Sequence, residues 1–304
     1  MLPAILTLNA GSSSLKFAAF DNSEAVSALV RGEIENLEDE PRLKATDARG
    51  HAIIEDQHLS ASSYDDVLAK LLCWIDEHLE GRRITAVGHR VVHGGARFIE
   101  PQCVTPQLIS ALEQLIPLAP LHQLHNLSLI RSIGMTRPDL AQIVCFDTAF
   151  HHTMPSVATR IALPREYERQ GVRRYGFHGL SYEYIAERLR VVAPEIARKK
   201  VIVAHLGNGA SLCALRNGQS IDTTMGFSAL DGLVMGTRCG TMDPGVLLYL
   251  TETLGVAPAA VEDLLYKHAG MLGVSEISGD MRVLLSSSDP RAHDAIELFV
   301  FHVV

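Results

Sequence analysis

Five short segments of the chain combine glycine with arginine, histidine, asparagine or serine, the residue types that bind anions. In chain order they are 9–16 (NAGSSSLK), 88–95 (GHRVVHGG), 173–179 (RRYGFHG), 205–211 (HLGNGAS) and 235–240 (MGTRCG). Small residues let backbone N–H groups approach an anion closely, and arginine forks bind carboxylate or phosphoryl oxygens in pairs. Together the segments predict a site that holds phosphates beside a small carboxylate.

Arg90 and Arg238 are the strongest candidates for the chemistry. When a carboxylate attacks a phosphoryl group, anion meets anion, and guanidinium groups stay charged while they neutralise both. Phosphoryl transfer depends mostly on positioning and charge neutralisation, so one arginine in this role contributes roughly 10³-fold or more in rate. A surface salt bridge is the alternative, but glycines flank each arginine segment. We therefore expect the two guanidinium groups to face one cleft.

Asp147 follows a short apolar segment, 143–146, that reads as a buried strand. A carboxylate nucleophile is already ionised at pH 7, so the chemistry needs no general base. Asp147 is thus expected either to orient magnesium or its waters, or to position an arginine. A capping aspartate at a strand end is the structural alternative.

Two of the glycine-bearing segments are turns that follow predicted strands. The apolar segment 4–8 precedes the turn 11–14 and a second strand at 15–20, and the segment 201–204 precedes the turn at 207–209. The first turn lacks the spacing of a Walker A loop, and an ordinary Gly-Ser hairpin is its alternative. This strand–turn–strand repeat is typical of a duplicated domain, although such short patterns also recur by chance.

Composition limits the functional classes. The chain has 304 residues, of which 47% are hydrophobic and 20% charged, the balance of a globular protein with two domains. Its net charge of -8 argues against a nucleic-acid partner, and no apolar stretch reaches the length of a membrane span. The five cysteines are scattered, and the N-terminus has no basic region typical of a signal peptide, so we expect a cytoplasmic protein.

Other elements follow from periodicity and from helix-terminal residues. A helix is predicted over 64–79, capped by Ser62 or Ser63, and another from Pro106 to Pro117. A strand is predicted over 84–87 and a helix over 181–192, capped by Ser181. His89 and His93 have the i,i+4 spacing of a zinc-binding helix, but β-branched residues lie between them, so we reject a metalloprotease. A last helix is predicted from Pro290, with its apolar face at Ile296, Phe299, Val300 and Val303.

In residues and in order, the five segments resemble the acetate kinase family (acetate and propionate kinases), from residue 5 to about residue 282. The resemblance implies reversible, ATP-dependent phosphorylation of acetate to acetyl phosphate by direct in-line transfer, with Mg²⁺ or Mn²⁺. It also implies an α/β fold with two ribonuclease-H-like domains, as in actin, Hsp70 and sugar kinases, with a cleft between them. We expect these domains at 1–148 and 149–304, and a homodimer formed through the second.

The resemblance assigns roles residue by residue. It gives catalysis to Arg90, Asp147, His178 and Arg238. It implies a carboxylate pocket at Arg90, Val92, Leu121, His122 and Phe177. It places ATP phosphates at Ser12, Ser14, Lys16, His205, Leu206, Gly207, Asn208 and Gly209, and metal at Asn9. Asp280, Met281 and Arg282 resemble a segment that contacts adenosine, and a solvated loop is an equal alternative for them.

The chain departs from the family pattern at two places near the pocket. Ala229 stands where proline is more common, and Gln123-Leu124 follows His122 where Asn-Pro is usual. A smaller side chain widens a pocket, yet one methylene gives only ~1–3 kcal/mol of discrimination. The sequence therefore leaves acetate and propionate open, and we expect propionate to be a usable second substrate.

The last predicted helix stops in mid-pattern at Val304 without a cap. Family members continue with a glycine-rich nucleotide loop and a glutamate that helps to hold magnesium. We therefore expect the second domain to be incomplete at its C-terminus. The alternative function is a non-catalytic nucleotide-binding module of the actin or Hsp70 type. Arg90 and Arg238 argue against this alternative, because a protein that only binds nucleotide needs no second anion site.

Overall fold

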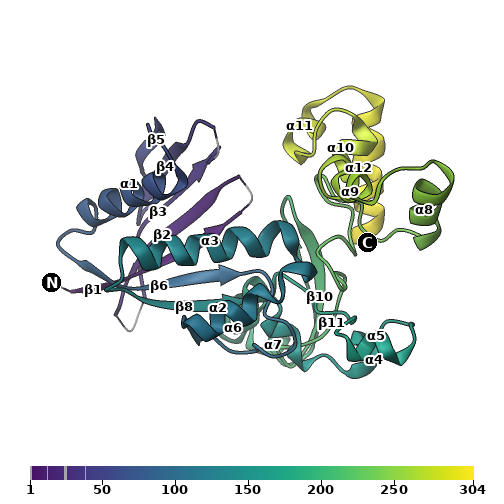
Figure 1. The fold of residues 1–304 in the computed structure, drawn as a ribbon, viewed down its shortest axis with the longest axis horizontal. Helices are drawn as coiled ribbons and strands as arrows, with labels where there is room; N and C mark the ends of the chain where they lie inside the picture. The colour runs from purple at the N-terminus through teal and green to yellow at the C-terminus, as the bar shows by residue number, and fades with distance from the viewer. Residues whose placement is uncertain (1, 12, 24–25, 38) are drawn as a thin grey trace. The chain divides into compact units, whose positions relative to one another are not determined.

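The computed structural model describes residues 2–11, 13–23, 26–37 and 39–304, and it describes the backbone but not the side chain of Leu121. The chain divides into two compact units, unit 1 over Met1–Ala149 and unit 2 over Phe150–Val304 (Figure 1). Both units mix helices and strands, which confirms the expected α/β class.

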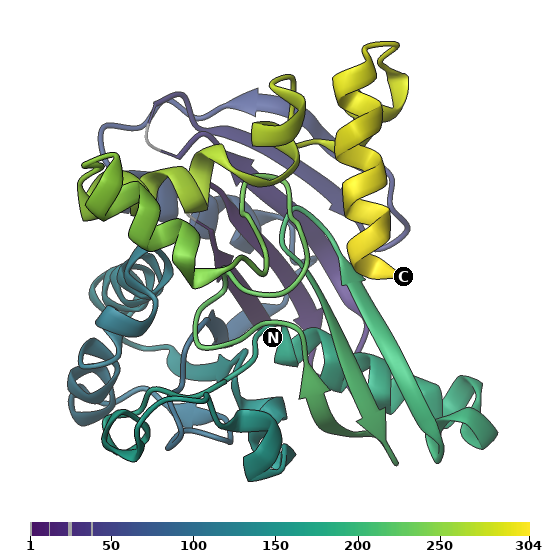
Figure 2. The same ribbon diagram turned by 90° about the vertical axis from the view of Figure 1, so that its right-hand side faces the viewer.

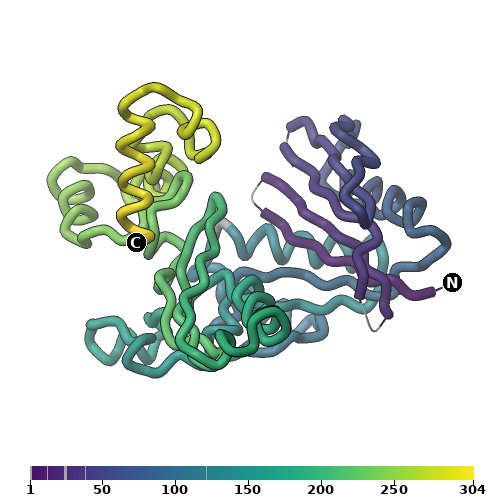
Figure 3. Tube along the Cα trace, turned by 180° about the vertical axis from the view of Figure 1, so that it is seen from behind, coloured from purple at the N-terminus to yellow at the C-terminus, as the bar shows by residue number. Residues whose placement is uncertain are grey.

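Unit 1 is built on one sheet, whose described strands run in the order β5-β4-β3-β2-β1-β6-β8-β7. Its strands are β1 (Pro3–Ala10), β2 (Leu15–Asp21), β3 (Ala28–Glu35), β4 (Arg42–Asp47), β5 (Ala52–His58), β6 (Arg83–Val91), β7 (Gln102–Cys103) and β8 (Ala141–Phe146). Strands β1 to β5 are consecutive antiparallel neighbours, visible as a row in Figure 3. Strands β1, β6 and β8 are parallel, so their carboxyl ends meet at one edge.

Helices cover one face of this sheet. They are α1 (Tyr64–Glu77), α2 (Pro106–Glu113), the short 3-10 helix η1 (Ile116–Leu118) and α3 (Pro120–Thr136). Alternate residues of β1 (Ala4, Leu6, Leu8 and Ala10) are buried in a core that α1 and α3 also supply. Because side chains alternate along a strand, Asn9 lies on the opposite, less buried face.

The helix boundaries of unit 1 are close to those expected. Ser63, not Ser62, caps α1 by accepting a hydrogen bond from the Asp66 backbone N–H, and α1 ends at Glu77, two residues early. Thr105 caps α2, and Pro106 stands at its first position as predicted, but α2 ends at Glu113, and the expected end residue Pro117 lies in η1 instead. His89 lies in strand β6, so the rejection of a zinc-binding helix at His89–His93 is confirmed.

Unit 2 contains an antiparallel sheet of β9 (Lys200–Leu206), β10 (Ala210–Arg216) and β11 (Gln219–Thr223), drawn in green in Figure 2. Like β1–β2–β3, these strands are joined consecutively, so the strand–turn–strand repeat is real. Helix α6 (Gly179–Val192) packs on one face of this sheet through Tyr182 and Ala186.

The other helical segments of unit 2 are short, apart from α12. They are η2 (Ala149–Thr153, a 3-10 helix that begins at the unit boundary), α4 (Ser156–Thr159), α5 (Arg165–Arg169), α7 (Pro194–Ala197), α8 (Pro244–Leu248), the π-helix η3 (Tyr249–Thr253), α9 (Pro258–Asp263), the π-helix η4 (Leu264–His268), α10 (Gly270–Ser275), α11 (Met281–Ser286) and α12 (Pro290–Val303). Among the described residues, no helix is long and apolar enough to cross a membrane.

Two expectations for unit 2 were wrong in detail. Helix α6 begins two residues before Ser181, so Ser181 lies inside its first turn and does not cap it. On α12, Ala292 and Ala295 are the buried residues, with Ile296 and Phe299 packed beside them. Val300 is 49% exposed, because the buried stripe of α12 runs along its alanines.

Candidate functional site

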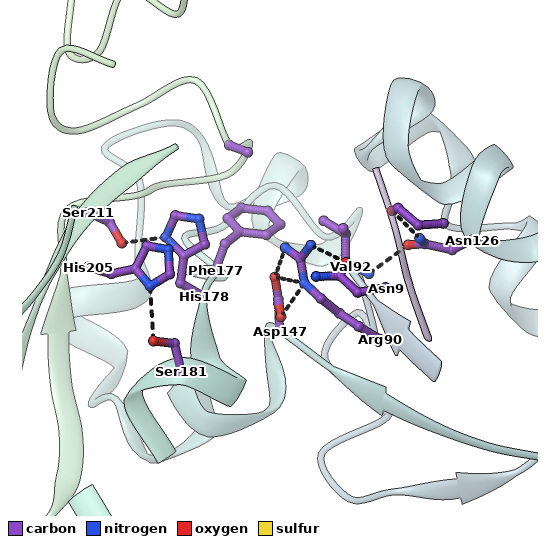
Figure 4. A network of polar contacts seen from close by, with 12 residues as sticks. Asn9, Arg90, Val92, Asn126, Asp147, Phe177, His178, Ser181, His205 and Ser211 are labelled. Atoms are coloured by element: carbon purple, nitrogen blue, oxygen red, sulfur yellow. Dashed lines mark hydrogen bonds and ion pairs between the residues drawn. The ribbon is translucent and has the colours of Figure 1, made fainter. Parts of the chain in front are cut away.

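An ion pair at the carboxyl edge of the unit 1 sheet holds Arg90. The Arg90 guanidinium donates Nε–H to both oxygens of Asp147 at 3.0 Å and Nη2–H to one of them at 2.5 Å (Figure 4). The Asp147 side chain is only 1% exposed, whereas that of Arg90 is 29% exposed. Asp147 therefore fixes one side of the guanidinium plane, while the arginine remains partly open.

Burial and charge act in opposite directions on Arg90. Desolvation disfavours its charged form, but the adjacent Asp147 carboxylate outweighs that effect, and the pKa of Arg90 is raised above its ordinary value. Arg90 is thus a permanent cation at the end of β6. Of the two roles expected for Asp147, this structure displays the contact that positions an arginine.

Asn9 lies on the neighbouring strand and completes this arrangement. Its Oδ1 accepts a hydrogen bond of 2.9 Å from Arg90 Nη1. In the register of β1 with β2, Asn9 is opposite Lys16, so both side chains point to the same sheet face. The strand pattern thus brings Asn9, Lys16 and Arg90 to one face at one end of the sheet.

Gly11 and Ser14 are the described residues on either side of the turn between β1 and β2. Gly11 donates its N–H to the Ser14 carbonyl at 2.7 Å, and Ser14 is half-buried. Ser12 lies outside the described residues. Lys16 is 65% exposed, and its Nζ lies 3.8 Å from the Glu33 carboxylate on β3. A backbone hydrogen bond therefore links Gly11 to Ser14, and Lys16 faces a carboxylate of the same sheet.

Asn126 of α3 was not singled out by the sequence, yet it joins the ends of β1 and β6. Its Oδ1 accepts from the Val92 backbone N–H at 2.9 Å, and its Nδ2 donates to the Ala10 carbonyl at 3.3 Å. Asn126 is buried and lies one helical turn beyond His122. The i,i+4 spacing from His122 was the available signal, but Asn126 has no neighbouring glycine and no charge that would mark it as a site residue.

The expected carboxylate pocket is partly described in unit 1. Val92 is buried at the end of β6, where its N–H is held by Asn126. His122 is half-buried in the first turn of α3. The Leu121 side chain lies outside the described part of the structure. Three of the four expected pocket residues of unit 1, Arg90, Val92 and His122, are therefore placed at the end of β6 or at the start of α3.

In unit 2, a strained backbone presents His178. Gly176 has φ +76, and a Cβ there would lie 2.6 Å from both His151 and Thr223, so only glycine fits. His178 itself has φ 59, a left-handed conformation uncommon for a residue with a side chain, and it is the N-cap of α6. Phe177 is buried, and its carbonyl accepts from His151 Nε2 at 2.9 Å.

Two histidine rings stack in this unit. The centroids of His178 and His205 are 4.0 Å apart, with an interplanar angle of 23°. Each ring is held at Nδ1 by a serine hydroxyl, His178 by Ser211 at 2.8 Å and His205 by Ser181 at 2.9 Å (Figure 4). The hydroxyl of Ser181, expected to cap α6, thus orients a histidine instead.

Arg238 and His178 both lie against the glycine turn between β9 and β10. A Cβ built on Gly209 would lie 2.7 Å from Arg238 Nη2 and 3.3 Å from His178 Nε2. Arg238 Nη1 also donates to the Ala229 carbonyl at 2.8 Å. The missing side chain of Gly209 therefore leaves room for a guanidinium and an imidazole at one backbone position.

The segment 235–240 is fastened to the same turn. Gly236 donates its N–H to the Asn208 carbonyl at 3.1 Å, and a Cβ on Gly236 would lie 2.1 Å from Asn208 Oδ1. Gly207 donates to the Gly209 carbonyl at 3.1 Å, while Leu206 is exposed. Three of the five predicted segments, 173–179, 205–211 and 235–240, thus meet within unit 2.

Asp280, Met281 and Arg282 form the start of α11. Asp280 caps that helix and accepts hydrogen bonds from the Arg282 side chain, which is 90% exposed. Met281 packs on the core beneath α10 and α12. The preceding residue, Gly279, closely approaches Gly236, so this exposed segment adjoins the turn region of unit 2.

Metal-binding groups are sparse. The described residues contain no cluster of three or more His, Cys, Asp or Glu side chains that could hold a metal ion. Asp147 and Asn9 supply one carboxylate and one amide oxygen, both in contact with Arg90. Such a set fits Mg²⁺, which keeps several waters and binds through one or two carboxylates plus substrate phosphates.

The chain is similar to known proteins in both sequence and structure. Residues 4–304 match the model of the acetokinase family. The acetate kinase of Rhodopseudomonas palustris (strain TIE-1) is 52% identical over 307 residues, covering 100% of this chain and 77% of that protein. The acetate kinase of Methylocella silvestris is 45% identical over 313 residues, covering 100% and 78%.

Solved structures agree with the sequence matches. A propionate kinase from Francisella tularensis superposes with a TM-score of 0.91 at 38% identity, over 99% of this chain and 78% of that one. The Porphyromonas gingivalis acetate kinase gives a TM-score of 0.83 at 35% identity, over 99% and 77%. These likenesses confirm the expected fold class.

Proposed function

Because this chain belongs to the acetokinase family, we propose that it catalyses reversible transfer of the γ-phosphoryl group of ATP to acetate. The reaction forms a bond between a carboxylate oxygen and the γ-phosphorus, and it breaks the bond from that phosphorus to the β-phosphate bridging oxygen. ADP leaves with the electron pair, and no proton is transferred. The task of the protein is to bring two anions together and to stabilise the charge that spreads over the transferring group.

The observation that carries this assignment is the Arg90–Asp147 pair. Asp147 engages Nε and Nη2 of Arg90, so the guanidinium has a fixed plane and a partly exposed face. A guanidinium held in this way can bind a carboxylate or a phosphoryl oxygen without first losing rotamer freedom. We assign Arg90 to substrate binding and charge stabilisation, and Asp147 to positioning it.

His178 and Arg238 are assigned to the transferring phosphoryl group. Both side chains lie beside Gly209, whose missing side chain leaves space at the turn. Arg238 supplies a cation there, and His178 supplies an imidazole. Preorganised donors of this kind stabilise developing negative charge without reorganisation during the reaction.

ATP contacts are assigned to the glycine-rich turns. The proposed phosphate contacts are Ser12, Ser14, Lys16, His205, Leu206, Gly207, Asn208 and Gly209. The adenosine contacts are proposed at Asp280, Met281 and Arg282, on the exposed start of α11.

We propose that Mg²⁺ or Mn²⁺ accompanies ATP. Asn9 and Asp147 are the residues that would hold it, directly or through its waters. When bound, the ion neutralises phosphate charge. The Arg90 guanidinium already contacts the side-chain oxygens of Asp147 and Asn9. We therefore infer that the metal and Arg90 either compete for these oxygens or divide them between them.

The acyl group is assigned to Val92, Leu121, His122 and Phe177. Propionate is the second candidate substrate, favoured by the TM-score of 0.91 with a structure named as a propionate kinase. We further propose a cytoplasmic homodimer with domains at 1–148 and 149–304, and no nucleic-acid or membrane partner.

Formation of acyl hydroxamate from acetate, ATP and hydroxylamine tests the function. We expect product with the wild-type chain and a loss of roughly 10³-fold in Arg90→Ala. Arg42→Ala is the matched control, since Arg42 also forms a two-bond pair with an aspartate, Asp56, but on the exposed edge of the same sheet. ATP binding without hydroxamate would instead favour a non-catalytic nucleotide-binding module.

A further inference from the structure

Three side chains in unit 2 form a continuous hydrogen-bonded series that ends at His178. Tyr182 Oη lies 2.5 Å from Ser211 Oγ, and Ser211 Oγ lies 2.8 Å from His178 Nδ1. Tyr182 and Ser211 are fully buried, whereas His178 is half-buried. The series therefore runs from the core between α6 and β10 out to the glycine turn.

The direction of these hydrogen bonds follows from counting hydrogens. A serine hydroxyl and a phenol each carry one hydrogen, and a buried hydrogen must find an acceptor inside the protein. Burial raises the pKa of Tyr182, so its hydroxyl stays protonated and remains a donor. Within the described residues, Ser211 Oγ is the hydrogen-bond partner of the Tyr182 hydroxyl.

Only one direction uses both hydroxyl hydrogens. If Tyr182 donates to Ser211, the Ser211 hydrogen is directed to His178 Nδ1, which must then be an acceptor. In the reverse direction, Ser211 would donate to Tyr182 and leave the phenolic hydrogen buried without an acceptor, which costs about 1–3 kcal/mol. The forward direction is therefore favoured.

We infer that Tyr182 and Ser211 are positioning residues that fix His178 in the neutral tautomer with its proton on Nε2. That nitrogen is the one that faces the Gly209 position, beside Arg238 Nη2. His178 therefore presents an N–H donor, rather than a lone pair, toward an anion held at the turn. The consequence for catalysis rests on the proposed function, whereas the tautomer is a property of the resting protein.

The neighbouring ring is arranged in the same way. Ser181 contacts His205 Nδ1 at 2.9 Å, and the two imidazoles stack at 4.0 Å. Stacking fixes the plane of His178, and the Ser211 contact fixes its rotation and its tautomer. A donor that is preset in both respects needs no reorganisation when charge develops on a phosphoryl oxygen.

Long-range ¹H–¹⁵N correlation spectra of the labelled protein read the tautomer directly. His178 is assigned by comparison with a His178→Gln variant. In the wild-type chain we expect protonated Nε2 and bare Nδ1, and in Ser211→Ala a mixture of tautomers. A wild-type His178 protonated on Nδ1, or a Ser211→Ala spectrum identical to wild type, would contradict the inferred role of the hydrogen-bonded series.

Ser220→Ala is the matched control, because Ser220 is also fully buried and contacts His151 Nδ1 at 2.8 Å. We expect it to leave the His178 spectrum unchanged.

In acetate phosphorylation, Ser211→Ala is expected to lower kcat about 10- to 100-fold and Tyr182→Phe about 3- to 10-fold, with KM for acetate nearly constant. Equal kcat losses in Ser211→Ala and Ser220→Ala would contradict a specific role. A wild-type chain that makes no acetyl phosphate would sink the proposed function, yet the spectra would still decide the tautomer.

Discussion

The Asp147 carboxylate, almost completely buried at the end of β8, accepts three hydrogen bonds from the Arg90 guanidinium at the end of β6. The two residues are separated by 57 positions in sequence. The parallel pairing of β6 with β8 brings them together, since the carboxyl ends of parallel strands lie at one edge. The guanidinium that we propose to serve two anionic reactants is thereby oriented before either one binds.

Replacing Asp147 by asparagine should lower kcat by about 10²-fold, because Arg90 keeps its charge but loses the partner that fixes its plane. Steady-state rates of acetate phosphorylation measure this. Asp56→Asn, which removes the matching charge from the exposed Arg42 pair, should leave kcat unchanged. Full activity in Asp147→Asn would show that the ion pair does not position Arg90.

A methyl group at residue 209 should act through Arg238. In Gly209→Ala the new Cβ would lie 2.7 Å from Arg238 Nη2, the far end of a flexible side chain, so Arg238 moves while the fold is retained. We expect kcat to fall about 10- to 100-fold with little change in thermal stability.

The double variant with Arg238→Ala separates this cause from others. If Gly209→Ala acts through Arg238, the double variant should lose hardly more activity than Arg238→Ala alone. Fully additive losses would mean that the methyl group disturbs something else at the turn.

Truncation of Asn126 should affect both stability and substrate binding. Asn126→Ala leaves the Val92 N–H and the Ala10 carbonyl without their partner, which costs about 1–3 kcal/mol. Because Val92 is a proposed pocket residue, KM for acetate should also rise. Ser132→Ala on the same helix removes a contact to Asp65 instead, and it should change stability but not KM. An unchanged KM in Asn126→Ala would remove Val92 from the pocket.

Two buried histidines should make unit 1 sensitive to acid. Burial lowers the pKa of His89 and of His93 from 6.5 to about 4. Above pH 6.5 both folded and unfolded states hold these rings neutral, so the contribution to stability is complete. As pH falls from 6.5 toward 4, the unfolded state takes up protons first, and stability is lost, on the order of 1–3 kcal/mol per histidine.

Urea unfolding across this pH range measures the effect. His89→Leu should flatten the dependence, whereas replacement of the exposed His51 by glutamine should change it little. An equally steep acid loss in His89→Leu would show that His89 does not cause it.

Much of the architecture could be predicted because strand alternation and glycine turns are local signals. The turns at Gly11 and Gly207–Gly209 are both where the sequence places them. The contacts among site residues were less accessible. No local pattern states that Arg238 reaches Gly209, because that contact depends on how a loop of unit 2 folds back on the turn.

The errors have a common physical origin. Serine is a residue type that often caps helices, so the sequence suggests Ser181 as the cap of α6. Because the left-handed His178 starts α6 earlier, the Ser181 hydroxyl contacts His205 instead. The sequence did not indicate Asn126, because its side chain acts by hydrogen-bonding two backbone groups at the ends of β1 and β6, which are distant in sequence. In each case a tertiary contact decides the role of a polar side chain whose local sequence suggests another one, or none.

The most direct test of the central claim is ³¹P NMR of the chain with ATP, Mg²⁺ and acetate. We expect a resonance of acetyl phosphate that grows as ADP forms, and that is lost in both Arg90→Ala and Arg238→Ala. It should be retained in Arg42→Ala and in Arg291→Ala, since Arg291 lies on α12 with half of its side chain exposed. Release of inorganic phosphate without acetyl phosphate, or full product formation in either active-site arginine variant, would contradict the account.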